Sequence, residues 1–252
     1  MIELKSITFS YYGKKILDNI SLSIREGELC GIIGPNGCGK TTLIRLLSRM
    51  TSPDRGEITL DGSPYSDITR KEFARSVSYF PQGRPIPDMT AEELVALGRF
   101  PHTSGGGLSS ADKAAVDAAF EGADCTEFRS RNLKELSFGE RQRVYMAMLL
   151  AQDARFALLD EPTTYMDISN QFAMLKLLSS MGSNGHGVVT VLHDINSALK
   201  FCDRLIIMSG GRIAFDGSPD AAVASGNISE VFGIACRAVE LDGVREYILT
   251  PQ

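Results

Sequence analysis

The chain has 252 residues, of which 43% are hydrophobic and 23% are charged, a composition typical of a folded protein with a substantial core. Its formal net charge of −5 argues against a general nucleic-acid binder, which would carry a basic surplus or stripe. No apolar run approaches the ~20 residues that cross a bilayer, and the N-terminus resembles a strand rather than a signal peptide. The five scattered cysteines form no C-x-x-C pair, which favours a reduced, cytosolic protein.

Short apolar runs separated by turns make up the first third of the chain. They predict strands at Ile2–Phe9, Ile16–Ile24, Leu29–Ile33, Glu57–Leu60 and Val77–Phe80, and a helix at Thr42–Arg49. From about Pro87 to Gln152 the sequence is rich in Ala, Glu, Leu and Met, as helices are. Here we expect helices at Ala91–Leu97, Ser110–Phe120 and Glu140–Ala151, with a flexible connector at Thr103–Gly107.

Strands and helices alternate in the last third of the chain, as in a parallel sheet. The expected elements are strands at Phe156–Leu159 and Val188–Leu192, helices at Ile168–Met181 and Ile195–Phe201, and a closing hairpin of Leu205–Met208 with Ile213–Phe215. Asp242-Gly243 predicts a second hairpin, between Val239–Leu241 and Val244–Ile248. We expect one domain, residues 1–252, with an α/β core at 1–86 and 153–252 and a helical insert at 87–152.

The stretch GPNGCGKT, Gly34–Thr41, fits the pattern G-x-x-x-x-G-K-[ST] and lies between a predicted strand and a predicted helix. Backbone N–H groups of such a turn, together with the helix dipole, bind phosphate. Lys40 can reach the β- and γ-phosphates, and the Thr41 hydroxyl can bind Mg²⁺. A chance glycine turn is the alternative, but the flanking elements favour a nucleoside triphosphate site. The expected nucleotide contacts are Gly34, Pro35, Asn36, Gly37, Cys38, Gly39, Lys40, Thr41 and Thr42. The same helix N-terminus predicts a lowered thiol pKa for Cys38. A small space-filling residue that the loop tolerates is the alternative.

Two acids, Asp160 and Glu161, follow the apolar run Phe156–Leu159. The carboxyl edge of a parallel sheet is the usual ligand crevice of an open α/β fold. We expect Asp160 to hold Mg²⁺ and Glu161 to polarise the water that attacks the phosphate. His193 follows the next predicted strand, and its place beside the phosphate site favours a γ-phosphate contact over a structural role. Taken without the P-loop, the two acids could simply cap a strand.

The segment LSFGERQR, Leu136–Arg143, begins a predicted helix. Ser137 is a good N-cap, and Glu140 three residues later completes a capping box. Capping alone explains these residues in full, so a functional role needs further support.

Together these motifs resemble the ATP-binding subunit of an ABC transporter over nearly the whole chain. GPNGCGKTT matches the Walker A motif, RFALLDE the Walker B strand with its catalytic glutamate at Glu161, and LSFGERQR the LSGGQ-type signature. Tyr79–Gln82 is similar to the Q-loop, Tyr165–Asp167 to the D-loop and His193 to the switch histidine. The resemblance implies a P-loop NTPase (RecA-like) core with an antiparallel β subdomain and an inserted α-helical signature subdomain.

The resemblance also implies roles for residues of the nucleotide site. Tyr11, rather than Tyr12, is expected to stack on adenine, and Gln82 to sense the γ-phosphate and Mg²⁺. The implied catalytic residues are Glu161, His193, Gln82 and Lys40, and the implied Mg²⁺ ligands are Thr41, Gln82 and Asp160.

Family members pair head to tail, with each ATP between one subunit's P-loop and the other's signature helix. The residues acting on the partner's ATP would be Ser137, Phe138, Gly139, Glu140 and Asp167. The resemblance further implies integral membrane permease subunits as partners, an indirect link to a substrate-binding protein, and a peripheral position on the cytoplasmic face of the inner or plasma membrane.

The segment MTAEELVALGRFPH, Met89–His102, resembles the importers of iron–siderophore complexes, haem and cobalamin. A plain amphipathic helix ended by a proline is the alternative. Phe138 departs from the family because a glycine is usual there, and we expect its backbone to have an ordinary, negative φ. A soluble, non-transport ABC ATPase and an ATP-dependent switch protein are the competing functions, although the single P-loop and the lack of a long coiled-coil insert weigh against several soluble classes.

Overall fold

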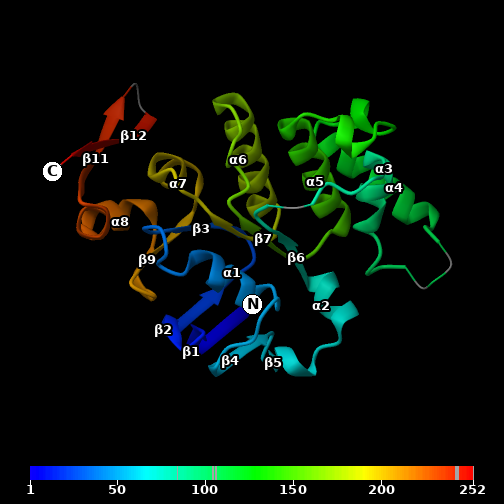
Figure 1. The fold of residues 1–252 in the computed structure, drawn as a ribbon. Coiled ribbons are helices and arrows are strands. Elements are labelled where there is room, and N and C mark those ends of the chain that lie inside the picture. The colour runs from blue at the N-terminus through cyan, green and yellow to red at the C-terminus, as the bar shows by residue number, and fades with distance from the viewer. Residues whose placement is uncertain (84, 104, 106, 242–243, 252) are drawn as a thin grey trace.

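A six-stranded sheet in the order β10-β9-β3-β8-β7-β6 runs through the centre of the protein in this computed structural model (Figure 1). Its strands are parallel except for β10, which pairs antiparallel with β9. They are β3 (Glu28–Ile33), β6 (Val77–Phe80), β7 (Phe156–Asp160), β8 (Gly187–Val191), β9 (Arg204–Ser209) and β10 (Arg212–Gly217). The structure describes residues 1–83, 85–103, 105, 107–241 and 244–251.

Side chains of the central strands are buried on both faces, which explains why these strands read as continuous apolar runs. Along β3, Leu29 and Ile33 join the core on one face of the sheet, whereas Cys30 and Ile32 join the core on the other. This alternation follows from the two-residue repeat of a strand. The sheet therefore separates two hydrophobic cores.

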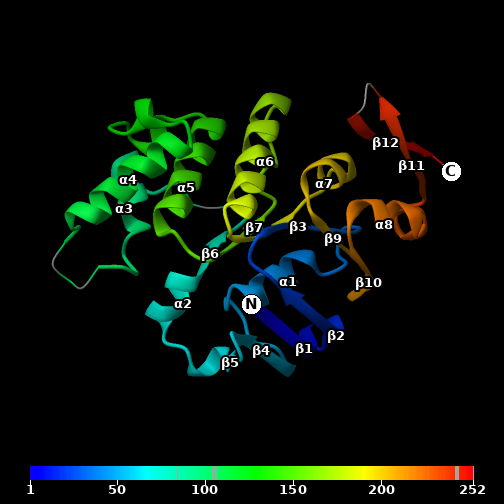
Figure 2. The same ribbon diagram turned by 180° about the vertical axis from the view of Figure 1, so that it is seen from behind.

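One core lies between the central sheet and a smaller antiparallel sheet, in the order β2-β1-β4-β5. Its strands are β1 (Ile2–Tyr11), β2 (Lys14–Ile24), β4 (Arg55–Leu60) and β5 (Ser63–Pro64). Helix α1 (Lys40–Leu47) packs in this layer, and α2 (Arg70–Ser76) leads from it into β6 (Figure 2).

The other core lies under the remaining helices. These are α3 (Ala91–Leu97), α4 (Ser110–Gly122), α5 (Phe138–Gln152), α6 (Ile168–Ser183), α7 (Ile195–Phe201), α8 (Pro219–Ala224) and α9 (Asn227–Phe232), with short 3₁₀ turns at Tyr65–Asp67, Thr126–Phe128 and Leu133–Glu135. The chain ends in an antiparallel pair, β11 (Ile234–Leu241) and β12 (Val244–Pro251), beside α7 and α8 (Figures 1 and 2).

A nearly buried ion pair organises the helical region formed by α3, α4 and α5. The Nε of Arg99 lies 2.9 Å from Oδ1 of Asp112, and its Nη1 donates to the carbonyl of Ala151 at 2.7 Å. The Nε2 of His102 lies 2.8 Å from the carbonyl oxygen of Gln152. Arg99 and His102 of the segment 89–102 therefore hold three helices together. The segment thus has a structural role, independent of its resemblance to importers.

The predicted strands and helices are all present, with ends that differ by a few residues. The structure adds β5, α2, α8 and α9, which the sequence analysis did not predict. The predicted turn Asp242-Gly243 lies outside the described residues, but the two strands beside it pair in the expected register, with Leu241 opposite Val244. The predicted connector at 103–107 includes residues 104 and 106, which also lie outside the described residues.

Candidate active site

The strand order brings the predicted catalytic residues to one edge of the central sheet. Neighbouring parallel strands β3, β8, β7 and β6 all end at this edge, and each is followed by a functional candidate. Lys40 follows β3, His193 follows β8, Glu161 follows β7 and Gln82 follows β6. Residues far apart in the sequence thus meet because their strands are neighbours in the sheet.

The turn between β3 and α1 requires glycine at two positions. A Cβ on Gly34 would lie 2.3 Å from the carbonyl oxygen of Met208, so no side chain fits there. Gly39 has a φ of 108°, and a Cβ there would lie 2.6 Å from Leu17. The turn can therefore wind tightly, and Pro35, Asn36 and Gly37 remain exposed at its tip. Such a turn leaves backbone N–H groups available for phosphate oxygens.

The Lys40 side chain is held inside this turn. Its Nζ donates to the carbonyl oxygens of Gly34 at 2.7 Å and Pro35 at 3.1 Å, and the residue is only 6% exposed. These are neutral acceptors, so an incoming phosphate would offer the ammonium a stronger, charge-assisted partner.

Thr41 and Asp160 form the second part of the site. The Thr41 hydroxyl donates to Oδ1 of Asp160 at 3.2 Å, and Asp160 is 1% exposed. Burial raises the pKa of the Asp160 carboxyl, with the nearby charge of Glu161 adding to the effect. Within the described part of the chain, no group of three His, Cys, Asp or Glu side chains forms a protein-only metal cage. Two oxygen donors beside a phosphate turn fit Mg²⁺, which usually keeps waters and takes the rest of its ligands from substrate.

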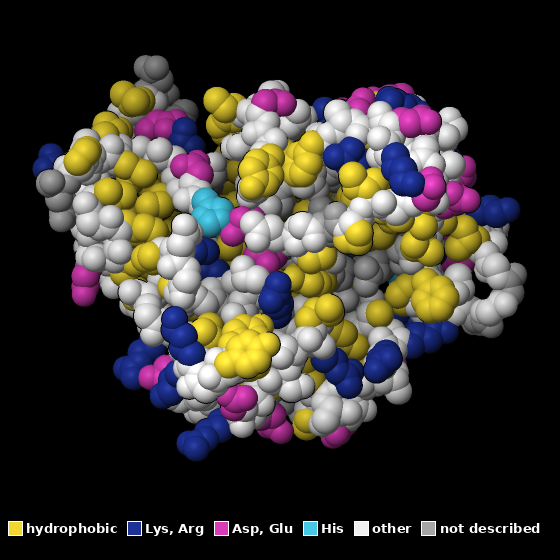
Figure 3. Space-filling model, in the orientation of Figure 1, with side chains coloured by type: hydrophobic (Ala, Val, Ile, Leu, Met, Phe, Trp, Pro, Cys, Tyr) yellow, Lys and Arg dark blue, Asp and Glu magenta, His cyan; other side chains and the backbone are white. Residues whose placement is uncertain are grey.

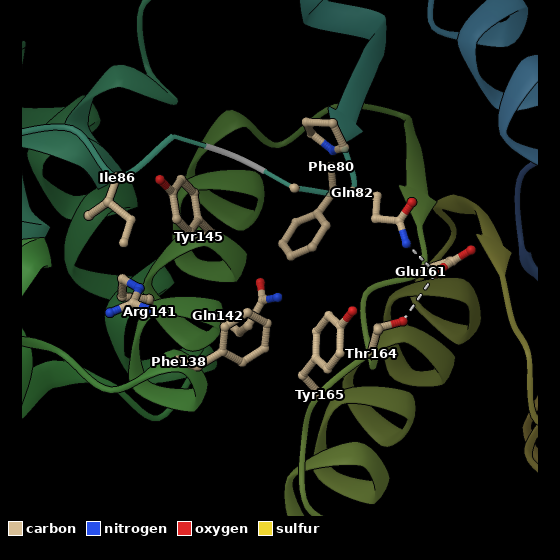
Figure 4. A pocket seen from close by; sticks show the side chains of 12 residues that line it. Phe80, Gln82, Ile86, Phe138, Arg141, Gln142, Tyr145, Glu161, Thr164 and Tyr165 are labelled. Carbon is tan, nitrogen blue, oxygen red and sulfur yellow. Dashed lines mark hydrogen bonds between the residues drawn. The ribbon is translucent and has the colours of Figure 1, made fainter.

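Glu161 is the most connected of the candidates (Figure 4). One carboxylate oxygen accepts hydrogen bonds from Nε2 of Gln82 at 2.5 Å and from the Thr164 hydroxyl at 3.2 Å. The other contacts Nε2 of His193. Glu161 also has a φ of 54°, which is costly for a residue other than glycine and persists only where its surroundings fix it. The side chain is therefore held in place on several sides at the edge of the sheet.

A cavity of about 260 Å³ lies over the P-loop. It is lined by Tyr11, Ile16, Asn36, Gly37, Gly39, Lys40, Thr41, Thr42, Glu161 and His193. Tyr11 lies in this lining, whereas Tyr12 is fully exposed, so the geometry favours Tyr11 of the two tyrosines. The sequence analysis missed Ile16, because nothing distinguishes it from any other apolar strand residue. It also missed Thr164, whose hydroxyl bond to Glu161 leaves no sequence signal.

The side chain of Cys38 turns away from the phosphate cradle and into the core. Cys38 is 5% exposed and belongs to the cluster around α1, and its Sγ lies 2.7 Å from the position that a Cβ on Gly34 would take. Burial raises the pKa of its thiol. The predicted lowering of that pKa was wrong, because loss of solvent outweighs the helix N-terminus.

The signature residues lie elsewhere, at the start of α5. Ser137 is the N-cap, with its backbone N–H 2.6 Å from Oε2 of Glu140 and its hydroxyl accepting from the backbone N–H of Glu140 at 3.4 Å. The predicted capping box is confirmed. Phe138 begins the helix without a positive φ, as predicted, and Gly139 follows it. Asp167 in turn caps α6, accepting from the backbone N–H of Asn170 at 2.9 Å.

These signature residues do not line the P-loop cavity. Phe138 instead lines a larger cavity of about 510 Å³ between α5, the segment after β6 and the segment after β7. Figure 4 shows its aromatic wall, which includes Phe80, Phe138, Tyr145 and Tyr165. Glu161 lines both cavities. One chain thus holds a P-loop site and a separate signature surface.

The match to a known family decides between the possible P-loop proteins. The profile of the ABC transporter family matches residues 17–164. The chain belongs to this family. Its members bind ATP and hydrolyse it, so the P-loop site is an ATP site and the protein is an ATPase.

Curated ABC transporter proteins resemble this chain over nearly its whole length. The ferric enterobactin transport ATP-binding protein FepC of Escherichia coli (strain K12) is 37% identical over 239 residues, covering 94% of this chain and 88% of that protein. The hemin import ATP-binding protein HmuV of Pseudomonas putida is 34% identical over 240 residues, covering 93% of each chain.

Solved structures of the family confirm the predicted P-loop NTPase fold. A bacterial ABC transporter cassette solved as a dimer matches with a TM-score of 0.77 and 30% identity, over 87% of this chain and 99% of that one. The ATP-binding subunit of an ABC transporter matches with a TM-score of 0.80 and 23% identity, over 92% of this chain and 98% of that one. None of the described helices is long and apolar enough to span a bilayer.

Proposed function

We propose that this protein is the ATP-hydrolysing subunit of an ABC importer for iron–siderophore, haem or cobalamin complexes. The position of Glu161 is the observation that carries the ATPase assignment. Glu161 lines the P-loop cavity, accepts hydrogen bonds from Gln82 and Thr164, and contacts His193. The similarity to ferric enterobactin and hemin import proteins supports the substrate class.

In this proposal each residue at the sheet edge has one task. Lys40 leaves the P-loop carbonyls and binds the β- and γ-phosphates, while Tyr11 stacks on adenine. Glu161 accepts a proton from the attacking water, and His193 contacts the γ-phosphate. Thr41, Asp160 and Gln82 would hold Mg²⁺, which neutralises developing phosphate charge when bound.

The signature residues require a second copy of the chain. Two subunits would pair head to tail, so that Ser137, Phe138, Gly139, Glu140 and Asp167 of one face the ATP of the other. The N-terminus of α5 provides a dipole suited to an anion, which supports this arrangement. The dimeric cassette that this chain resembles supports it as well.

Membrane permease subunits complete the proposed assembly, together with a substrate-binding protein outside the membrane. The chain would then sit peripherally on the cytoplasmic face of the inner or plasma membrane, and nucleic acid would have no part. Lys and Arg side chains are interspersed with acidic and hydrophobic ones on the face shown in Figure 3, which supports the last point. We also propose the division into a core, residues 1–86 and 153–252, and a helical subdomain, residues 87–152.

Reconstitution tests the proposal. The subunit is co-expressed with a permease of the iron–siderophore, haem or cobalamin import class, placed in liposomes and supplied with ATP inside and binding protein outside. We expect ATP-dependent uptake of a ferric siderophore, haem or cobalamin, and no uptake with the variant Glu161→Gln. If the purified chain hydrolyses ATP but neither binds nor responds to any permease, the alternative of a soluble ABC ATPase is correct instead.

A further inference from the structure

Helix α7 begins two residues after His193, so the position of this helix sets the position of that side chain. Asp194 is the N-cap, and its carboxylate accepts from the backbone N–H groups of Asn196 at 3.3 Å and Ser197 at 2.9 Å. Just before this cap, Nε2 of His193 contacts Glu161. Because α7 has only seven residues, or about 10 Å at the usual rise of a helix, a displacement of its far end is passed on to His193.

Apolar contacts hold α7 from two directions. Ile195, Ala198 and Leu199 are buried in the core on the helical face of the central sheet. In the last turn, the ring of Phe201 packs on Phe172 of α6, with centroids 5.6 Å apart. These contacts fix α7 against the sheet and against α6.

An ion pair with the C-terminal hairpin, which lies beside α7 in Figures 1 and 2, holds the helix from a third direction. Nζ of Lys200, in the last turn of α7, lies 2.8 Å from Oε1 and 2.6 Å from Oε2 of Glu246 on β12. The hairpin is itself attached to α8, where Oδ1 of Asp220 accepts from the Tyr247 hydroxyl at 2.9 Å and lies 2.9 Å from Nε of Arg245. Glu246 therefore presents a fixed negative charge to the end of α7 that is farther from His193.

We propose that the C-terminal hairpin is part of the support of the active site, because Glu246 holds α7, through Lys200, where His193 stays against Glu161. The inference rests on the proposed function, in which Glu161 accepts a proton from the attacking water and His193 contacts the γ-phosphate. Lys200 and Glu246 are positioning residues, since neither lines the P-loop cavity. Loss of their ion pair slows hydrolysis but leaves the binding of ATP to the P-loop unchanged.

Charge reversal in the full-length chain tests this support. Lys200→Glu and Glu246→Lys each place two like charges opposite one another, and we expect each to lower the kcat for ATP hydrolysis about twofold to fivefold. The KM for ATP should stay at the wild-type value. The double variant Lys200→Glu/Glu246→Lys restores the ion pair with its charges exchanged, so it should recover most of the wild-type kcat.

The imidazole ring of His193 provides a second readout, which a general loss of stability would not reproduce. The chain has three histidines, so the NMR resonance of this ring can be assigned with the variant His193→Ala. Each single reversal should shift the His193 resonance and leave those of His102 and His186 in place, and the double variant should return it. Arg245→Glu is the matched control, because it breaks an ion pair of the same hairpin with α8 rather than α7, and it should keep the wild-type kcat and His193 resonance.

The inference is overturned by single reversals with the wild-type kcat, by an unshifted His193 resonance, by a double variant no more active than the single ones, or by an equal loss of activity in Arg245→Glu. A melting temperature for each variant separates these results from loss of folding, and Lys200→Gln and Glu246→Gln serve if the reversed variants do not fold. Wild-type turnover in His193→Ala would instead refute the role of His193 in the proposed function. Loss of turnover in His193→Ala, with wild-type turnover in both reversals, counts against the hairpin alone.

Discussion

The P-loop region and the signature region are built in opposite ways, although both are expected to bind phosphate. In the P-loop region Lys40 and Asp160 are buried, and Gly34 packs against the backbone of a different strand. In the signature region Ser137 and Phe138 are exposed, and the capping contacts come from within four residues. The P-loop region depends on contacts between distant segments, whereas the cap at the start of α5 is formed by neighbouring residues.

This difference separates two requirements of a shared active site. Burial raises the effect of each charge near the phosphates and fixes the catalytic groups, so the P-loop region suits chemistry. An exposed helix start can meet and leave a partner without disturbing the core. We therefore expect substitutions in the P-loop region to change catalysis and stability strongly, and substitutions in the signature region to change association modestly.

Replacement of Glu161, which accepts hydrogen bonds from two side chains and contacts His193, should produce the largest loss of ATP turnover. Glu161→Gln keeps the shape of the side chain but loses the general base, so the ATP turnover rate should fall about a hundredfold or more. ATP binding should survive, and the ATP-bound variant should accumulate as a dimer. Phosphate release and size-exclusion chromatography with ATP measure these two properties. Turnover within threefold of the wild type would falsify the role of Glu161.

The second-largest effect is expected when the charge of the P-loop lysine, Lys40, is removed. Lys40→Ala loses charge-assisted hydrogen bonds to phosphate, so ATP affinity should fall about tenfold to a hundredfold. Isothermal titration with ATP measures the Kd. Lys40→Arg is the matched control, because it keeps the charge but not the fit, and an intermediate affinity is expected. An unchanged Kd in Lys40→Ala contradicts the P-loop assignment.

Asp160 should show a conflict between stability and function. Because burial raises its folded-state pKa, ionised Asp160 lowers stability at neutral and higher pH, and this cost fades as the pH falls through that pKa. Asp160→Asn should therefore raise the nucleotide-free melting temperature, while removing the Mg²⁺ dependence of ATP binding. Thermal scans at several pH values measure the first effect. A variant that melts below the wild type at pH 8 argues against it.

The smallest change is expected in the signature region. The backbone N–H of Ser137 lowers the pKa of the Glu140 carboxyl, so Glu140 is ionised where the partner's γ-phosphate should approach. Glu140→Gln keeps the capping geometry and removes the negative charge. ATP-driven dimerisation should strengthen about twofold to fivefold, less at high salt. Analytical ultracentrifugation with ATP measures the dimer dissociation constant of the Glu161→Gln variant with and without Glu140→Gln. Weaker dimerisation with Glu140→Gln would contradict the prediction.

The same contrast explains what the sequence could and could not predict. The capping box was predictable because Ser137 and Glu140 are three residues apart, and the central strands because parallel strands are continuously apolar. Helix α2 was missed although Thr69 and Glu72 form a capping box at its start, because only Phe73 is buried in its seven residues and they show no apolar repeat. The short helices α8 and α9 have too few turns to show a periodic pattern.

The directions of side chains at the site were even harder to predict from the sequence. The P-loop pattern placed Cys38 in the phosphate cradle, but the structure buries its side chain in the core around α1, with Sγ close to Gly34. The contact of Phe138 with Tyr165 joins segments that no sequence periodicity links. Local chemistry was therefore readable from the sequence, and contacts between segments were not.

The capping box at Ser137 and Glu140 has a consequence for the stability of the subunit when it is unpaired. A helix start that satisfies its own backbone needs no second subunit to remain folded. In the proposed dimer, the two subunits would separate after hydrolysis without leaving unpaired backbone N–H groups at the start of α5. An unpaired subunit would then be a stable resting form of the protein.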